Sequence, residues 1–145
     1  MAENRYKKEI LLSDERNRNV AAVVRYGPHL FLSSSDGHRD INTEKIQPEL
    51  DNQPTPQCNN AYGRQALRLQ KAGYGGDSAV WVENFTSGQY WRLERMATWP
   101  EHFGEEGHKL AVSFGAQCKM SGVNMLTAVV QAVTPDLERE VFVHQ

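Results

Sequence analysis

The sequence predicts an α+β domain in which two helices pack on one face of a mixed β-sheet. Strand-like and helical stretches follow one another in the order β-β-α-β-α-β-β, and the chain shows no internal repeat. Residues 125–133 are apolar at nearly every position, which is typical of a central strand covered on both faces. Residues 109–115 are predicted to form the strand before it. Helices or a second subunit could cover the second face of this sheet.

The length and composition of the chain exclude several classes of protein. The chain has 145 residues, which suits one domain with a hydrophobic core. The net charge is -2 and no basic stripe interleaves with aromatic residues, which argues against a nucleic-acid partner. Cys58 and Cys118 form no CxxC motif, which argues against a disulfide scaffold or a metal site. Without an apolar signal segment or a membrane-length apolar run, we expect a soluble, cytoplasmic protein that contacts no membrane.

The first third of the chain is predicted to contain a hairpin. Residues 1–18 are charged and are expected to form an N-terminal arm or an edge segment ahead of a single domain, 19–145. Residues 19–26 and 29–33 are strand-like, and Gly27-Pro28 between them is a turn signal. The polar segment that follows, to Thr55, is longer than a usual connection. Such segments cover a site, meet a neighbouring subunit or are disordered.

Two helices are expected. The first begins at Pro56 with Thr55 as its cap, runs to about residue 71 and ends at Gly73. Its apolar stripe consists of Cys58, Ala61, Tyr62, Ala66, Leu69 and Ala72. Residues 78–85 are predicted as a strand, and residues 90–103 as the second helix, kinked or restarted at Pro100. A loop is expected at 104–107, and a short strand at 141–143.

Several weak motifs occur in a familiar order. They are FLSSS at the end of the hairpin, QKAG at the end of the first helix, AVWVENF, EHFGEEG and the final AVTP. Over about residues 20–135 this layout resembles the Rid (YjgF-type) family of enamine and imine deaminases. The resemblance implies a chorismate-mutase-like fold and a homotrimer. In that trimer three sheets form a barrel-like core, the helices lie outside and the active clefts lie between subunits.

The residues that the family uses are only partly matched. The resemblance places Lys109 where deaminating members have an arginine that binds the substrate carboxylate. Met96 falls near the family's asparagine, and Thr127 falls near its acidic residue. Ser33 matches the family's serine, but Ser34 replaces the glycine after it. The family's tyrosine before the first hairpin has no clear counterpart. The deaminase site is therefore not carried over intact.

The candidate anion-binding residues each have a plain structural alternative. Lys109 offers positive charge but not the two-pronged hydrogen bonding of arginine, and a surface lysine needs no such role. Arg95 and Glu94 could supply the missing guanidinium and acid, or could form an exposed helical charge pair. The hydroxyls and backbone N–H groups of Ser33–Ser35 could bind a carboxylate or an oxyanion, or could simply permit a turn.

The remaining candidates are polar, reactive or aromatic. Gln117 could orient a water molecule or cap a strand end, and Phe85 and Tyr90 could form an apolar wall of the cleft. Cys118 lies beside a lysine that would favour its thiolate, although an inert thiol is the alternative. His38 lies between two aspartates, a pattern suited to a metal, a proton relay or a solvated loop. His102 and His108 are candidate general acids or bases.

Three hypotheses follow. The first is a hydrolase that releases ammonia from a small imine, enamine or related compound, with Lys109, Ser33 and Gln117 as its main residues. It needs no cofactor, because a C=N carbon is already electrophilic. The second is an isomerase, cyclase or amide hydrolase on the same trimeric scaffold. The third is a trimer that binds a small ligand without turnover, or acts like a chaperone.

Overall fold

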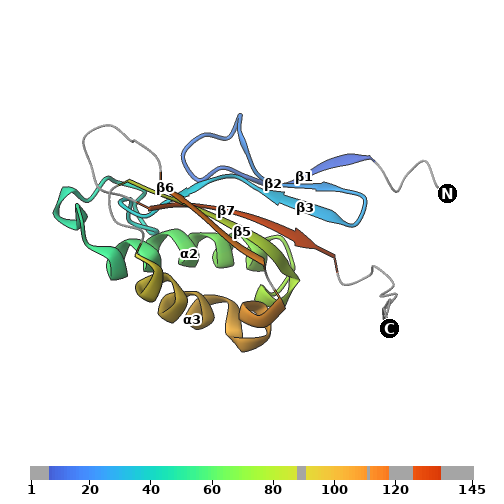
Figure 1. Cartoon of the computed structure of the whole chain (residues 1–145). Coiled ribbons are helices and arrows are strands. Elements are labelled where there is room, and N and C mark those ends of the chain that lie inside the picture. The colour runs from blue at the N-terminus through green and yellow to red at the C-terminus, as the bar shows by residue number, and fades with distance from the viewer. Residues whose placement is uncertain (1–6, 88–90, 111, 118–125, 135–145) are drawn as a thin grey trace, which may run out of the picture.

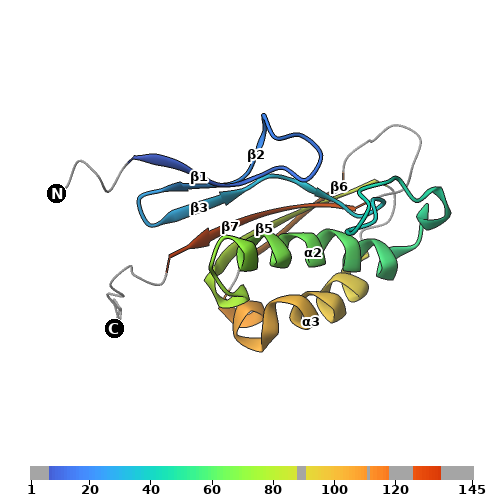
Figure 2. The same cartoon turned by 180° about the vertical axis from the view of Figure 1, so that it is seen from behind.

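The computed structural model describes residues 7–87, 91–110, 112–117 and 126–134, with the backbone alone at 105–110 and 112–117. Within these ranges two long helices lie on one face of a mixed sheet (Figure 1), and the view from behind shows the same layering (Figure 2). The predicted α+β class, with both helices on one face, is confirmed. We call the other side of the sheet the helix-free face.

The described strands form one sheet with a crossover. They are β1 (Lys8–Ser13), β2 (Ala21–Tyr26), β3 (His29–Leu32), β4 (Ser35–Asp36), β5 (Ala79–Thr86), β6 (Val112–Gln117) and β7 (Leu126–Val133). The strand order is β1-β2-β3-β7-β5-β6, and β4 also pairs with β7. The predicted central strand is confirmed as β7. The last two strands of the chain are not neighbours, because β5 lies between them and pairs in parallel with β6.

The hairpin and the edge segment are both present. β2 and β3 pair antiparallel, and Gly27 in their turn has a φ of 59°, a conformation that glycine adopts without steric cost. β1 pairs with β2 at the edge of the sheet, so residues 8–13 form an edge strand rather than a free arm. Leu11 and Leu12 pack against the core and hold this edge strand in place.

The first helix, α2 (Pro54–Lys71), begins two residues before the predicted start. Gln53 is the residue that caps it, and no side chain makes a capping hydrogen bond, so Thr55 is not the cap. The predicted end is confirmed. Gly73 has a φ of 94°, its N–H donates to the carbonyl of Gln70, and the N–H of Tyr74 donates to the carbonyl of Leu69. This pair of bonds is a Schellman motif.

The second helix, α3 (Arg92–Leu110), extends further toward β6 than the sequence predicts. The chain stays helical through Pro100 and departs from helical geometry at Gly104, where φ is 73° and ψ is 167°. Because glycine tolerates positive φ, the chain turns there once and then resumes a helix. The predicted loop at 104–107 and the predicted strand start at Lys109 are wrong. Lys109 lies in the last helical turn, and β6 begins at Val112.

The core lies between the sheet and the two helices. Leu126, Ala128, Val130 and Ala132 of β7 are buried, and they alternate with half-buried residues that face the other side. Tyr62 of α2 meets Trp99 of α3 edge to face with ring centroids 5.1 Å apart. None of the helices within the described ranges is long and apolar enough to span a membrane.

Candidate functional site

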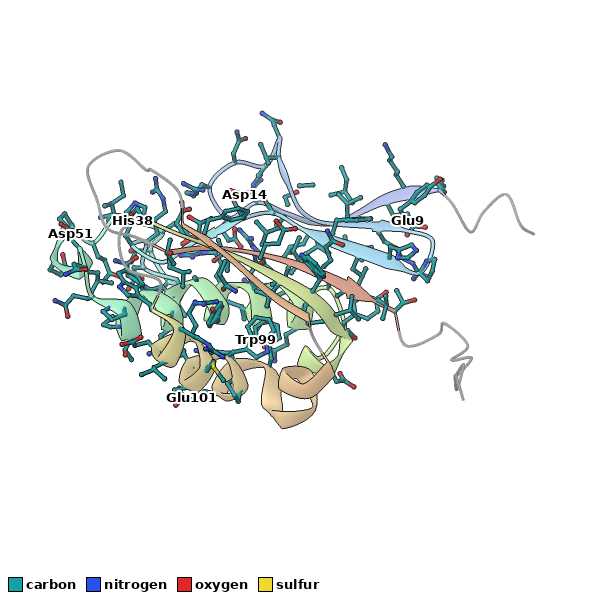
Figure 3. The ribbon with its side chains drawn as sticks, in the orientation of Figure 1. Glu9, Asp14, His38, Asp51, Trp99 and Glu101 are labelled. Atoms are coloured by element: carbon teal, nitrogen blue, oxygen red, sulfur yellow. The ribbon has the colours of Figure 1, made fainter. Side chains whose placement is uncertain are left out.

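One end of the sheet gathers several residues singled out by the sequence. Strand pairing places Phe85 of β5 and Asp36 of β4 on either side of Thr127 of β7. The last residue of β6, Gln117, pairs with Thr86, next to Phe85. We call this the site end of the sheet. His38 lies at the same end (Figure 3), because it follows β4 directly.

Lys109 lies at the opposite end of the sheet. β6 starts at Val112, which pairs with Trp81 near the beginning of β5, and it ends at Gln117. At about 3.3 Å per residue, these six residues separate the two ends by roughly 17 Å. A single chain therefore does not bring Lys109 together with Ser33 and Gln117.

At the site end a carboxylate lies on the helix-free face, with a guanidinium close to it. Thr127 Oγ1 donates a hydrogen bond of 3.2 Å to Asp36 Oδ1, and Arg39 Nε lies 3.5 Å from Asp36 Oδ2. The side chains of Asp36 and Arg39 are 22% and 24% exposed. Both side chains are held in place and partly exposed, and the half-buried Phe85 lies on the other side of Thr127. Sequence reasoning noted Asp36 only as a neighbour of His38, because the β4–β7 pairing joins residues 91 positions apart.

The three serines are held by α2. The carbonyl oxygens of Ser33 and Ser34 accept hydrogen bonds from Arg68 Nη1, of 2.6 and 3.1 Å. Ser35 is 1% exposed and its Oγ accepts from Arg64 Nη1 at 2.9 Å. The hydroxyl of Ser35 therefore faces the helix layer and anchors the connection after β3. Its neighbour Asp36 points to the helix-free face, since successive residues of a strand alternate sides.

Two buried arginines on α2 were missed by sequence reasoning. Arg64 is 3% exposed and donates hydrogen bonds to the carboxylate of Glu44. Arg68 is 2% exposed and donates hydrogen bonds of 2.7 and 2.9 Å to the carboxylate of Glu15. Burial alone would raise the pKa of Glu15, but the hydrogen bond and charge of Arg68 lower it below its usual value. The two arginines are four residues apart on a helix, a spacing that could have been recognised as one face.

His38 is almost fully buried at 8% exposure, and its Nδ1 makes no hydrogen bond within the described residues. Burial lowers the pKa of His38, with Asp36 acting in the opposite direction. A neutral imidazole at the site end can accept a proton, which fits the relay hypothesis better than the solvated-loop alternative. Among the described residues, no group of three His, Cys, Asp or Glu side chains could hold a metal ion.

The start of α3 places Arg95 inside the protein. Arg95 is 5% exposed, so the exposed charge-pair alternative is wrong for this residue, while Glu94 is half-buried. Both charges act on the buried thiol of Cys58. Burial raises the pKa of Cys58 to about 12, Arg95 lowers it and Glu94 raises it further. Burial of Cys58 therefore favours the protonated thiol over the reactive thiolate.

Some candidates are only partly described. Tyr90 and Cys118 lie outside the described residues, and the side chains of Lys109, Gln117 and His108 are not described. His102 is half-buried in α3, and its Nε2 lies 3.0 Å from Asn59 Oδ1 of α2. Burial lowers the pKa of His102, and Glu101 raises it. His102 lies on the helical side of the molecule and not on the helix-free face.

Known proteins resemble this chain in structure. No family model matches the sequence, and no curated protein matches it. Solved structures do match. A conserved Rid-family protein of unknown function, YyfA from Yersinia pestis, has a TM-score of 0.72 and 11% identity, over 88% of this chain and 100% of that one.

Two further solved structures are similar. A putative endoribonuclease L-PSP from Entamoeba histolytica has a TM-score of 0.69 and 13% identity, over 88% of this chain and 99% of that one. A member of the YjgF/YER057c/UK114 family from Mycobacterium tuberculosis has a TM-score of 0.64 and 16% identity, over 88% and 100%. The chain therefore has the YjgF/Rid fold that its sequence motifs predict.

Proposed function

We propose that this protein is a divergent Rid-type hydrolase, which releases ammonia from a small imine, enamine or related unsaturated nitrogen compound. The observation that carries the proposal is the hydrogen bond from Thr127 to Asp36. The resemblance implies an acidic residue near Thr127, and Asp36 supplies a carboxylate from the neighbouring strand. Arg39, 3.5 Å from that carboxylate, supplies a guanidinium for an anionic substrate.

The residues fit a hydrolysis of the C=N bond. Asp36 orients a water molecule and takes its proton as the water oxygen attacks the C=N carbon. As the π bond breaks, the imine nitrogen takes up a proton, which gives a carbinolamine. Its C–N bond then breaks as the nitrogen takes up a second proton and the hydroxyl proton leaves to Asp36, so that ammonia departs and a carbonyl compound remains. In this proposal His38, whose Nδ1 makes no hydrogen bond within the described residues, relays protons to and from Asp36. The half-buried ring of Phe85 forms an apolar wall.

The proposed assembly is a homotrimer that packs through the helix-free face. Five residues, one from each of five neighbouring strands, pair in succession and form a row across this face. They are Ile10, Val24, Phe31, Gln131 and Trp81. Four of these five side chains are apolar, and Ile10 is 71% exposed and Phe31 45% exposed, which is typical of a surface that another chain covers. Packing of subunits through this face would cover the row. It would also allow Lys109 of one subunit to approach the site end of another.

The test is ammonia release from 2-iminopropanoate generated in situ, compared with the rate in buffer alone. We expect wild-type protein to accelerate release. Asp36→Asn should lower kcat by about a hundredfold or more, the usual effect of losing a general base. Glu49→Gln is the matched control, because Glu49 is an exposed carboxylate on the same connection and should leave the rate unchanged.

Two outcomes would contradict the proposal in different ways. An Asp36→Asn variant as active as wild type would remove Asp36 from the mechanism, even if the protein is a deaminase. No acceleration by wild type across a panel of imines would contradict the deaminase activity itself. Measurable binding of the same acids without turnover would then favour a ligand-binding trimer.

A further inference from the structure

A second candidate site lies on the helical side of the molecule. A groove of about 440 Å³ runs between α2 and α3, and Ile41 and Tyr74 contribute to its walls. It does not include any residue of the proposed hydrolase site. Because the proposed trimer packs through the helix-free face, this groove stays open to solvent in that assembly.

Small residues of α2 form part of the groove lining. Gly63 and Ala66 lie one turn apart on α2, and both line the groove together with Leu67. A Cβ at Gly63 would lie only 3.2 Å from Cε1 of His102, which is tighter than an ordinary contact. The glycine thus lets the imidazole lie against α2. An open groove with mostly apolar walls can take a planar ring laid against them.

His102 places a hydrogen-bond acceptor at this groove. Its Nε2 lies 3.0 Å from Asn59 Oδ1, which is an acceptor, so Nε2 carries the hydrogen. In the neutral ring Nδ1 then keeps its lone pair. Nδ1 lies 3.5 Å from the position of a Cβ on Gly63, a residue that also lines the groove. Within the described residues, no hydrogen bond to Nδ1 is formed.

Tyr74 fixes the far wall. Its hydroxyl accepts a hydrogen bond of 3.3 Å from Arg25 Nη1, which ties the wall to β2. Gln70, exposed at the mouth of the groove, offers an amide that can both donate and accept. The groove therefore combines apolar walls with one imidazole acceptor and one amide in its lining. This is the usual build of a small-molecule site, where a few polar groups orient a ligand held by apolar surface.

We propose that this groove binds a small, flat aromatic heterocycle whose ring N–H donates a hydrogen bond to Nδ1 of His102. The ligand is of a different chemical class from the non-aromatic imines of the hydrolase site. The proposal does not rest on that activity.

The experiment is a titration followed by ¹H–¹⁵N NMR, with benzimidazole and 1-methylbenzimidazole as matched probes. Both are flat, but only benzimidazole has a ring N–H. We expect shift changes at residues 63–70, 74–76 and 102. Benzimidazole should bind about threefold to tenfold more tightly than its methylated form, because one hydrogen bond usually increases affinity by about that factor. In His102→Phe, which keeps a ring without the acceptor, the two probes should bind alike.

Gly63→Ala should weaken both probes by at least tenfold, because the added methyl narrows the groove, while the dispersed spectrum shows that the fold is kept. Glu101→Gln is the control, since Glu101 is exposed next to His102 but does not line the groove. It should leave the affinity for both probes unchanged. Shift changes that avoid these segments, or equal affinity of wild type for the two probes, would overturn the proposal.

Discussion

Arg64 and Glu44 form a two-pronged ion pair that fixes the long connection between β4 and α2. Arg64 Nη2 lies 2.6 Å from Glu44 Oε2, and Arg64 Nε lies 2.8 Å from Oε1. The same guanidinium donates to the carbonyl oxygens of Asp36 and Arg39, both at 2.8 Å. One buried side chain of α2 therefore fixes the backbone at Asp36 and Arg39 through hydrogen bonds.

Replacing Arg64 should destabilise the protein strongly. Arg64→Met keeps apolar volume but leaves Glu44 and two carbonyl oxygens without their donor. Removal of one partner from a buried ion pair usually costs about 3–5 kcal/mol, and we expect a loss in that range from urea unfolding monitored by circular dichroism. Arg18→Met, at an exposed arginine of the β1–β2 connection, is the control and should change little. A loss below about 1 kcal/mol for Arg64→Met would mean that the pair does not hold the connection.

The pairing of Glu15 with Arg68 should make stability depend on pH. The pKa of Glu15 in the folded protein lies below its usual value near 4.5, because Arg68 outweighs the effect of burial. A depressed pKa contributes stability that is complete above pH 4.5 and is lost as the pH falls through the folded value. Urea unfolding between pH 7 and pH 3 should show a steeper loss for wild type than for Glu15→Gln. Parallel curves for the two proteins would contradict this assignment.

The sequence predicts the fold well where local patterns decide the structure. The hairpin follows from the Gly27 turn, the end of α2 follows from Gly73, and β7 follows from its continuous apolar run. The prediction fails at residues 104–110. There, one glycine changes the helix direction without ending it, and no local pattern distinguishes a kink from a stop.

The candidate site could be predicted only in part. Ser33–Ser35 and Phe85 do lie near one end of the sheet. Asp36 and Thr127 could not be paired from the sequence, because strand pairing over a long separation sets their contact. Arg64 and Arg68 were missed for a related reason. Their buried partners come from the connections at residues 14–15 and 33–44, whose course over α2 has no periodic signal.

Gly73 should be one of the more sensitive surface positions. Its φ of 94° is unfavourable for any residue with a Cβ, while no atom lies within 4 Å of that position. The cost of Gly73→Ala is therefore conformational, about 1–2 kcal/mol. Gly73→Asn should cost less, because asparagine tolerates positive φ better. Thermal and urea unfolding would measure both. A Gly73→Ala variant as stable as wild type would argue against the Schellman end of α2.

Cys58 should resist thiol reagents in the folded protein. It is fully buried, and burial raises the pKa of its thiol to about 12, so the reactive thiolate is scarce at neutral pH. In a Cys118→Ser background, labelling by a disulfide reagent at pH 8 should be at least a hundredfold slower in buffer than in 6 M urea. The urea sample is its own control for reagent quality. Rapid labelling in buffer would mean that Cys58 is exposed at the start of α2.

His102 should titrate below its usual pKa of 6.5, because burial disfavours the imidazolium more than Glu101 favours it. An NMR titration of the His102 ring would give the midpoint. Glu101→Gln should lower the midpoint further, since it removes the group that raises the pKa. The linked effect on stability has a definite sign. Below pH 6.5 the unfolded chain binds a proton that the folded chain does not, so the contribution of His102 to stability falls as the pH decreases.

Two results would contradict this account of His102. A midpoint above 6.5 would mean that the ring is stabilised as the imidazolium and donates through both nitrogens. A midpoint that rises in Glu101→Gln would mean that Glu101 acts through a change in packing and not through its charge. A depressed midpoint, together with an Nε2–H tautomer seen in ¹⁵N spectra, would leave Nδ1 as an acceptor at neutral pH, which the groove between α2 and α3 requires.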